Sequence, residues 1–274
     1  MNGMKALAAA AALCVAASQA RAQQDADAWD PWEKWSLSVG AFVADLDNTI
    51  RIGAPGVGLE FDLESALGLK NSQTVFRLDG GYRFGNNNRH RVDFTWFDLS
   101  RDATRTLQEE IEIGGIVYPI GTIVDSEFDL AFYNVRYAYS FIKDDRIDFA
   151  GSIGLHITQL GMFIEDTAGL IGAGGDSVTA PLPLIGMRMD VALTPSWYVR
   201  SSVEALYLSF GDFTGSISDM LLAGEYRARE NFSIGLGLNA VRMELENDNA
   251  LGINFDGRFR SDFVGLMLYG RAMF

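Results

Sequence analysis

Apolar and polar residues alternate one by one along ten separate stretches of this chain. The clearest stretch has Phe76 and Leu78 on one parity and Arg77 and Asp79 on the other. Because successive side chains of a β-strand point to opposite faces, each stretch predicts a strand with one apolar and one polar face. The predicted strands cover 35–44, 76–84, 91–96, 131–141, 147–158, 185–193, 197–207, 222–227, 232–240 and 264–274.

The links between these strands alternate in length. Short links follow the second, fourth, sixth and eighth strands, and longer links follow the others. A meander of this kind places all its short turns at one end. We therefore predict an all-β, antiparallel up-and-down barrel of about ten strands, with eight and twelve as alternatives. The expected long links are 45–72, 101–126, 169–176, 211–218 and 247–256, and Asp62 in the first of them is placed to cap one helical turn.

The polar parity decides which face of the barrel is inside. A soluble lipocalin-like barrel would turn its apolar parity inward, and the alternation alone fits either arrangement. However, every cation on the polar parity is Arg and none is Lys. Arg suits paired, partly desolvated sites because its planar fork binds carboxylates in two places, so the polar parity is expected to line a closed lumen. The predicted ion-pair network comprises Arg77, Asp79, Arg83, Arg91, Asp93, Arg136, Asp148, Arg188, Asp190, Arg200, Glu204, Glu225, Arg227 and Arg271, with His156 among them.

Aromatic residues gather near the predicted short turns, as they do at a membrane interface, although core packing is the alternative explanation for them. They are Trp35, Tyr139, Phe141, Phe149, Trp197 and Phe232.

The first 22 residues are predicted to be a signal peptide. Lys5 precedes an apolar run over 6–17, and Ala20 and Ala22 flank a cleavage site after Ala22. The run is too short for a bilayer-spanning anchor, and Leu13 before Cys14 disfavours a lipoprotein. Residues 23–274 then form one domain. Removing Lys5 and Arg21 leaves 20 basic residues against 36 acidic ones, a net charge of −16. Such a chain should not bind nucleic acid, and its acidic excess is expected in the loops.

Together these features resemble a Gram-negative outer-membrane β-barrel protein. The last strand, with Val264, Leu266, Leu268 and the terminal Phe274, is similar to the signal that the barrel-assembly machinery reads in that class. The patch over 61–69 resembles a motif of small, poorly characterised members. The resemblance implies location in the outer membrane, with its lipid and lipopolysaccharide as partners. It implies no particular activity, and it leaves the oligomeric state open, with a monomer expected.

Three functions are compatible with this sequence. The first is a structural or interaction barrel whose lumen is filled by ion pairs and whose loops are acidic. The second is a narrow pore for small solutes. The third is an enzyme acting on lipid A or on peptides, which is disfavoured because His90 and His156 are the only histidines and neither has a neighbouring catalytic motif. We predict that the chain is not an enzyme.

No cofactor, nucleotide or metal site is predicted either. Histidine or cysteine pairs with ligand spacing are missing from the sequence, and the Gly-rich stretch over 169–175 lacks the Lys of a phosphate-binding loop. Two acidic clusters, Glu109-Glu110-Glu112 and Asp125-Glu127-Asp129, are more typical of solvated faces than of divalent-cation sites that bridge to lipopolysaccharide.

Overall fold

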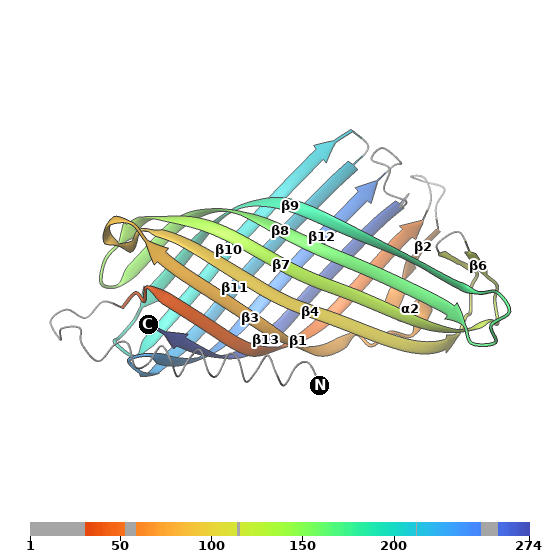
Figure 1. Ribbon diagram of the computed structural model, residues 1–274, viewed down its shortest axis with the longest axis horizontal. Coiled ribbons are helices and arrows are strands. Elements are labelled where there is room, and N and C mark those ends of the chain that lie inside the picture. The colour runs from red at the N-terminus through yellow and green to blue at the C-terminus, as the bar shows by residue number, and fades with distance from the viewer. Residues whose placement is uncertain (1–30, 53–58, 114–115, 212, 248–256) are drawn as a thin grey trace.

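The computed structural model describes residues 31–52, 59–113, 116–211, 213–247 and 257–274. Each described barrel strand pairs antiparallel with the next, and the last strand returns to the first with a register from Ser36↔Met273 to Ile52↔Gly257. The pairing closes a ten-stranded barrel, as predicted (Figure 1). Its strands are β1 (Trp35–Ile52), β3 (Ser72–Phe84), β4 (His90–Thr106), β7 (Ile123–Lys143), β8 (Ile147–Asp166), β9 (Ala173–Ala192), β10 (Trp197–Phe210), β11 (Phe213–Arg229), β12 (Phe232–Asn247) and β13 (Gly257–Met273).

Four tight turns connect the strands at one end, which we call the short-turn end. Between β3 and β4, the 3-10 helix η1 (Asn86–Asn88) places Asn87 and Asn88 at positive φ, which asparagine tolerates. Between β7 and β8, Asp144 accepts backbone N–H bonds from Arg146 and Ile147, both at 2.8 Å. These bonds favour the charged carboxylate and lower the pKa of Asp144.

The links at the opposite, long-link end carry small elements. β2 (Leu59–Asp62) extends the sheet beside β1 and leads into the helix α2 (Leu63–Leu67), and β5 (Ile111–Ile113) pairs with β6 (Ile116–Tyr118). Asp62 accepts a 2.5 Å bond from the backbone N–H of Ser65, which confirms the predicted helix cap. Gly68 ends α2 at φ 76°, a conformation that favours glycine. Within the described residues, no helix is both long and apolar enough to cross a membrane.

The strands extend further toward the long-link end than the sequence predicted. β1 continues to Ile52, β4 continues to Thr106 and β7 begins at Ile123. The expected loop over 169–176 shortens to residues 167–172. The expected loop over 211–218 is almost entirely strand, because β10 ends at Phe210 and β11 begins at Phe213. Two of the five predicted long loops are therefore short. The expected loop over 247–256 lies almost entirely outside the described residues.

The polarity of the two barrel faces reverses along the strands, and this explains the error. On the short-turn half of β4, Arg91 and Asp93 point inward while Phe94 points outward. Further along the same strand, Phe97 and Leu99 point inward. Asp98 then lies on the exposed outer face. The same reversal runs around the barrel and divides its interior into a charged half at the short-turn end and an apolar half at the long-link end. The apolar half includes Phe42, Leu46, Phe97, Leu99, Phe128, Leu130, Phe132, Ile217, Met243, Leu245, Phe259 and Phe263.

The outer surface is apolar around the charged half. The side chain of Ile153 is 61 % exposed and that of Ile185 is 63 % exposed, so both lie on the outer surface and not in the protein core. Aromatic side chains lie on this surface near the short turns, where Trp35 packs on Tyr82 at a ring-centroid distance of 4.0 Å. The outward faces of the ten barrel strands therefore form an apolar belt that ends where the interior changes from charged to apolar.

Candidate functional site

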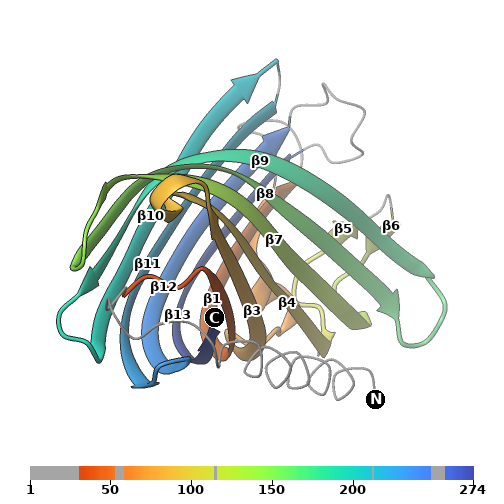
Figure 2. The same ribbon diagram turned by 60° about the vertical axis from the view of Figure 1, so that its left-hand side comes forward.

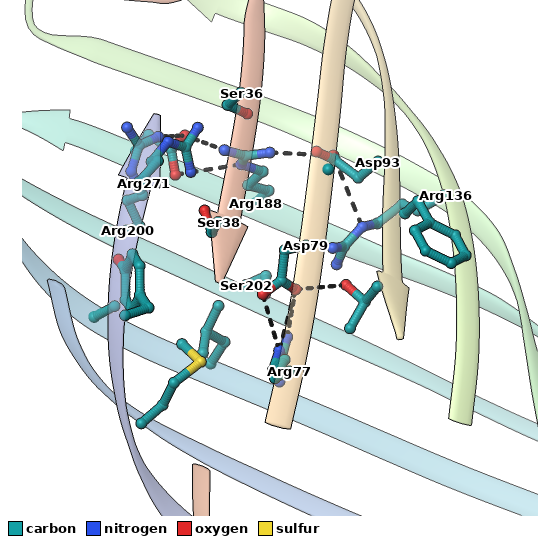
Figure 3. A pocket seen from close by; sticks show the side chains of 18 of the residues that line it. Ser36, Ser38, Arg77, Asp79, Asp93, Arg136, Arg188, Arg200, Ser202 and Arg271 are labelled. Carbon is teal, nitrogen blue, oxygen red and sulfur yellow. Dashed lines mark hydrogen bonds and ion pairs between the residues drawn. The ribbon is translucent and has the colours of Figure 1, made fainter. Parts of the chain in front are cut away.

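The predicted ion-pair residues lie together in the charged half of the interior (Figure 3). Arginines come from β3, β4, β7, β9, β10, β11 and β13, and the predicted carboxylates come from β3, β4, β8, β9, β10 and β11. Most of the side chains are buried, and Asp79, with 28 % side-chain exposure, is the most accessible partner in these pairs. The structure joins Arg77 to Asp79, Arg83 to Asp148, Arg91 to Asp93, Arg136 to Glu204, Arg188 to Asp93 and Asp190, and Arg200 to Asp190 and Glu225.

A continuous chain of alternating charges crosses the lumen. Asp93 contacts Arg188 at 3.2 Å, and Arg188 also bonds to Asp190. Asp190 lies 3.0 Å from Arg200, which is 2.8 Å from Glu225. Since each inner charge has a partner on two sides, the desolvation cost of one ion is shared over several interactions. This chain joins β4 to β11 through the middle of the barrel.

One member of the network was not predicted. Glu33 lies before β1 and is buried, and it bonds to Arg271 and approaches Arg200 at 3.6 Å and Arg227 at 4.0 Å. Among the described residues, the ion pairs of Arg271 and Arg227 are with Glu33, whereas Arg200 also pairs with Asp190 and Glu225. An acidic residue between Trp32 and Trp35 was visible in the sequence, but it precedes the first alternating stretch and so had no assigned face.

The segment around Glu33 closes the short-turn end of the lumen. Trp32 is 3 % exposed and donates its indole N–H to the backbone oxygen of Asp144 at 2.6 Å. Arg227 donates to the backbone oxygen of Pro31 at 2.9 Å. Trp32 also packs against the buried ring of Tyr198, edge-on at 6.4 Å. The chain that enters β1 thus sits inside the barrel mouth as a small plug.

The two cavities described among the inward-facing residues are small. The cavity among the ion pairs has a volume of about 80 Å³ and is lined by Arg77, Arg136 and Arg188, among others. A cavity among Phe42, Phe97, Phe132 and other side chains of the apolar half measures about 10 Å³. The first volume holds a few water molecules, and the second is no larger than a single water.

Glycine allows one of the internal contacts. A Cβ atom on Gly235 would lie 2.1 Å from the ring of Tyr269. The bare backbone lets the Tyr269 ring lie flat over β12 and places its hydroxyl 3.1 Å from Glu225. Substitution of Gly235 would displace this ring from the network.

His156 points into the interior where the charged and apolar halves meet. It is 2 % exposed, its ring meets Phe132 edge-on at 5.2 Å, and neither ring nitrogen has a hydrogen-bond partner among the described residues. His90 lies at the short-turn rim, where its Nδ1 is 2.7 Å from the hydroxyl of Tyr137. Each histidine is placed by aromatic neighbours, so the geometry described here gives neither of them an oriented carboxylate of the kind a general base needs.

The helix α2 lies against the apolar half near the long-link end. Leu63 and Leu67 are fully buried there, because their i,i+4 spacing puts them on one side of the helix. Glu64 accepts a 2.5 Å bond from Arg101 and two bonds from Asn48, at 2.9 Å to its backbone and 2.7 Å to its side chain. The patch over 61–69 that resembled a family motif therefore contains the end of β2, the helix α2 and its Gly68 cap, and its buried side chains anchor this segment to the barrel.

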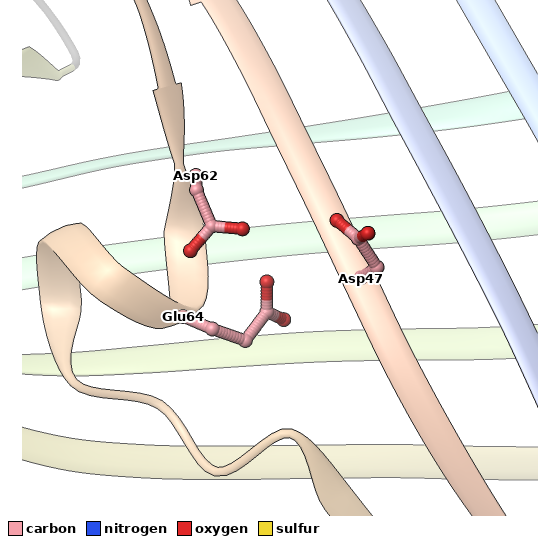
Figure 4. A group of neighbouring side chains, drawn as sticks. All are labelled: Asp47, Asp62 and Glu64. Atoms are coloured by element: carbon pink, nitrogen blue, oxygen red, sulfur yellow. The ribbon is translucent and has the colours of Figure 1, made fainter.

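Three carboxylates come close together beside α2 (Figure 4). Oxygen atoms of Asp47, Asp62 and Glu64 lie within 4.8 Å of one another. Glu64 is already neutralised by Arg101, and Asp62 accepts the helix-capping bond. The group is thus accounted for by these protein contacts and does not require a cation. Asp125, Glu127 and Asp129 of the second predicted acidic cluster lie along the outward parity of β7.

The terminal strand places its predicted assembly residues on the outer surface. Val264, Leu266 and Leu268 are each at least half exposed within the apolar belt. Phe274 and Trp35 exchange two backbone bonds, at 2.7 and 3.0 Å, which join the two ends of the barrel sheet. Their reading by the assembly machinery stays a prediction.

No protein-family model and no curated protein sequence matches this chain. Among solved structures, the outer membrane protease OmpT from Escherichia coli is similar over 91 % of this chain and 100 % of its own, with a TM-score of 0.54 and 10 % identity. Two other structures have lower TM-scores. The outer membrane protein OprG from Pseudomonas aeruginosa has a TM-score of 0.37 and 12 % identity, over 90 % of this chain and 99 % of its own. The toluene transporter TodX from P. putida has a TM-score of 0.36 and 10 % identity, over 88 % of this chain and 90 % of its own. The likeness to OmpT shows the barrel fold, and at this identity it shows nothing of activity.

Proposed function

We propose that this chain, which has the fold of outer-membrane β-barrel proteins, is a filled, non-conducting barrel in the outer membrane of a Gram-negative bacterium. Its role is structural or one of interaction, carried by the part of the barrel that stands above the membrane. The observation that carries the proposal is the two-part filling of the interior, by ion pairs in one half and by packed apolar side chains in the other.

The outer surface supports placement in a bilayer. On β8, outward-facing apolar residues run from Ile147 to Ile157 before Gln159 interrupts them. With a rise of about 3.3 Å per residue and a strand tilt of about 40°, this stretch covers about 25 Å along the membrane normal, the height of a barrel's lipid-facing band. The short turns then lie on the periplasmic side and the long links outside the cell.

The filled interior supports the absence of a pore. A water-filled path would have to pass the plug at Glu33, the ion pairs that cross the lumen, and the apolar half, whose cavity is only about 10 Å³. The plug and the crossing ion pairs are linked, because Glu33 pairs with Arg271 and Arg200. The apolar half lies further along the same strands and is held by packing instead of charge. Loss of the charged barrier would therefore leave the packed apolar half in place.

The extension above the membrane presents a carboxylate-rich face. Asp98 and Asp102 of β4 and Glu127 and Asp129 of β7 point outward there and are exposed, and Asp102 pairs in register with Glu127. The outward parity of these strand ends contains no Lys or Arg. By contrast, outward carboxylates on β12 and β13 are paired, as in the 2.6 Å contact of Arg242 with Asp262. The unpaired acidic face is therefore the surface we assign to contact with cationic partners, or with lipopolysaccharide through divalent cations.

Single-channel recording tests the closed lumen. The purified full chain is folded into planar bilayers, with a reference porin reconstituted in parallel to show that openings are detectable. We expect a quiet baseline over a range of voltages. Steady nanosiemens-scale openings would contradict the proposal and favour a small-solute pore. Cell fractionation, with gel migration compared before and after boiling, checks the outer-membrane location independently.

A further inference from the structure

The barrel wall has no β9–β10 strand pairing in the half toward the long-link end. Pairing of the two strands ends at Ala205↔Ile185, although β9 continues to Ala173 and β10 to Phe210. Over these lengths β9 remains paired with β8, and β10 with β11. Figures 1 and 2 both show the long-link ends of β9 and β10 diverging widely. We call this opening the β9–β10 seam.

Two prolines explain where the seam begins. Ala192 donates its N–H to the backbone of Arg146 on the β8 side, and Leu193 donates to Trp197 on the β10 side. Because backbone groups of alternate residues face alternate neighbours, and neither pairing of β9 has a register shift, residues of the same parity as Leu193 face β10. Pro183 and Pro181 have this parity and no N–H to donate. At these two positions β9 therefore has no N–H to donate to β10, and only its carbonyl groups remain for the ladder.

A second gap in strand pairing, between β3 and β4, is bridged by side-chain hydrogen bonds, which the β9–β10 seam does not show among its described residues. Pairing of β3 with β4 ends at Arg77↔Phe97, but there the chain around α2 bridges the strands. Gln73 donates to the backbone of Ser100 at 2.7 Å, and Arg101 donates to the backbone of Lys70 at 3.1 Å. Between described residues 178–184 of β9 and 206–209 of β10, no comparable hydrogen bond crosses the β9–β10 seam.

The seam gives access to apolar side chains on the lumen face. Leu182 and Leu184 of β9 are buried, but Leu208 of β10 is 38 % exposed even though it shares the inward parity of Glu204. On the outward face of the two strands beside the seam, Ile185 and Tyr207 are exposed, Tyr207 by 71 %. Every side chain on both lips between Val178 and Ile185, and between Leu206 and Ser209, is uncharged.

We infer that the β9–β10 seam is a lateral binding site for one acyl chain of an outer-leaflet membrane lipid. The seam starts within the apolar belt, beside the outward-facing Leu155 and Ile157 of β8, so lipid tails are its immediate neighbours. An acyl chain covers Leu208 by apolar contact alone, whereas an added protein strand would need backbone N–H donors that Pro181 and Pro183 do not have on the β9 side. This inference rests on the membrane placement proposed above.

Photo-crosslinking tests the site. The full chain is folded into phosphatidylcholine vesicles that contain a phosphatidylcholine with a diazirine on its acyl chain, and labelled residues are mapped by mass spectrometry. We expect label on the lumen-facing Leu206 and Leu208 of β10, which are the more exposed side chains of the seam. Leu130, which also faces the lumen but lies behind the paired wall of β4, β7 and β8, should stay unlabelled. Label on Ile153 and Leu266 reports insertion itself.

A reversible lock provides the matched control. Leu184 and Leu206 occupy the ladder position next to the last β9–β10 pair, so the double variant L184C/L206C can join the strands by a disulfide. When the disulfide is formed, label on Leu208 should fall to background, and reduction should restore it. Persistence of the label in the locked protein overturns the inference, as does label on Ile153 and Leu266 without label at the seam. Absence of label on Ile153 and Leu266 would instead reject the membrane placement.

Discussion

Glu64 of α2 and Arg101 of β4 form a buried ion pair at 2.5 Å, beside the apolar half of the barrel interior. Arg101 also lies over the ring of Phe128, at 4.6 Å from its centroid, and donates to the backbone of Lys70. The pair therefore joins a short helix to the barrel wall at a place where neither charge is hydrated. It holds the first long link against the wall at the long-link end of the barrel.

Loss of one member of this pair should be more damaging than loss of both. Glu64→Gln leaves the Arg101 cation buried without its counter-ion, and the free energy of unfolding should fall by about 3 kcal/mol. The double variant Glu64→Leu with Arg101→Met removes both charges and should lose less. Urea unfolding of the protein in lipid vesicles measures both.

The neighbouring carboxylate supplies the control for this comparison. Asp47 belongs to the same cluster but is exposed, so Asp47→Asn should change stability by no more than about 0.5 kcal/mol. Equal losses for Glu64→Gln and Asp47→Asn would show that the ion pair does not hold α2.

The apolar half of the interior should behave like the core of a soluble protein. Phe132 is 2 % exposed and packs against Phe97 at 4.6 Å between ring centroids. Phe132→Ala leaves a cavity among rigid aromatic neighbours and should cost about 3–5 kcal/mol of unfolding free energy. Ile153→Ala, on the outer face of the adjacent strand, should cost clearly less because lipid tails fill the space. The prediction fails if the outer substitution is the more damaging of the two.

The turn between β7 and β8 should weaken in acid. The backbone N–H groups of Arg146 and Ile147 lower the pKa of Asp144 from its usual 3.8. Because the folded pKa lies below the unfolded one, this carboxylate stabilises the fold fully above pH 3.8, and its contribution disappears as the pH falls through the lower, folded value. The thermal stability of the wild type should therefore exceed that of Asp144→Asn at pH 6 and approach it as the pH is lowered toward 2.

Asp145→Asn provides the comparison for the acid experiment, since the turn bonds described above go to Asp144 alone of the two carboxylates. The Asp145 variant should follow the wild-type profile. A difference between wild type and Asp144→Asn that does not change with pH would contradict the assignment.

The carboxy-terminal residue should matter for assembly in cells rather than for the folded state. Deletion of Phe274 should lower the amount of barrel that migrates as a folded species without boiling, whereas Phe274→Tyr should retain it. Spontaneous folding of the deletion variant into vesicles should proceed nearly as for the wild type. If folding in vesicles fails equally, the terminal aromatic acts through the β1–β13 closure, where Phe274 and Trp35 exchange backbone bonds.

The strand count, the alternation and the inward direction of the arginines could be predicted because each is a local property of the sequence. A pleated strand shows its two faces directly as odd and even residues, and this held for Arg77 and Asp79 as for the other strands. The partners could not be predicted in the same way. Arg83 meets Asp148 at 2.5 Å, and their strands are three places apart around the barrel, so the pairing depends on strand tilt and stagger.

The extension of the strands toward the long-link end was not predicted, for a different reason. Asp45 and Asp47 follow Val43 on the outward parity. The prediction assumes that the whole outer face contacts lipid, so these outward carboxylates mark the end of the predicted strand. The inward parity of the same stretch, with Phe42, Ala44 and Leu46, already showed the reversed pattern. Glu33 was missed because its place in the barrel depends on where the chain returns, which no local periodicity encodes.

In the proposed membrane placement, the reversal of polarity also sets the depth of the barrel in the bilayer. A displacement of two residues along the strands, about 5 Å along the membrane normal, would carry the outward carboxylates at Asp98 and Asp262 into hydrocarbon in one direction. In the other direction it would lift Ile185 and Leu266 into water. Both displacements are unfavourable. The outward residues of the strands therefore fix the depth of the barrel in the bilayer. A partner that binds the exposed carboxylates could displace the barrel along the membrane normal only by moving every strand together.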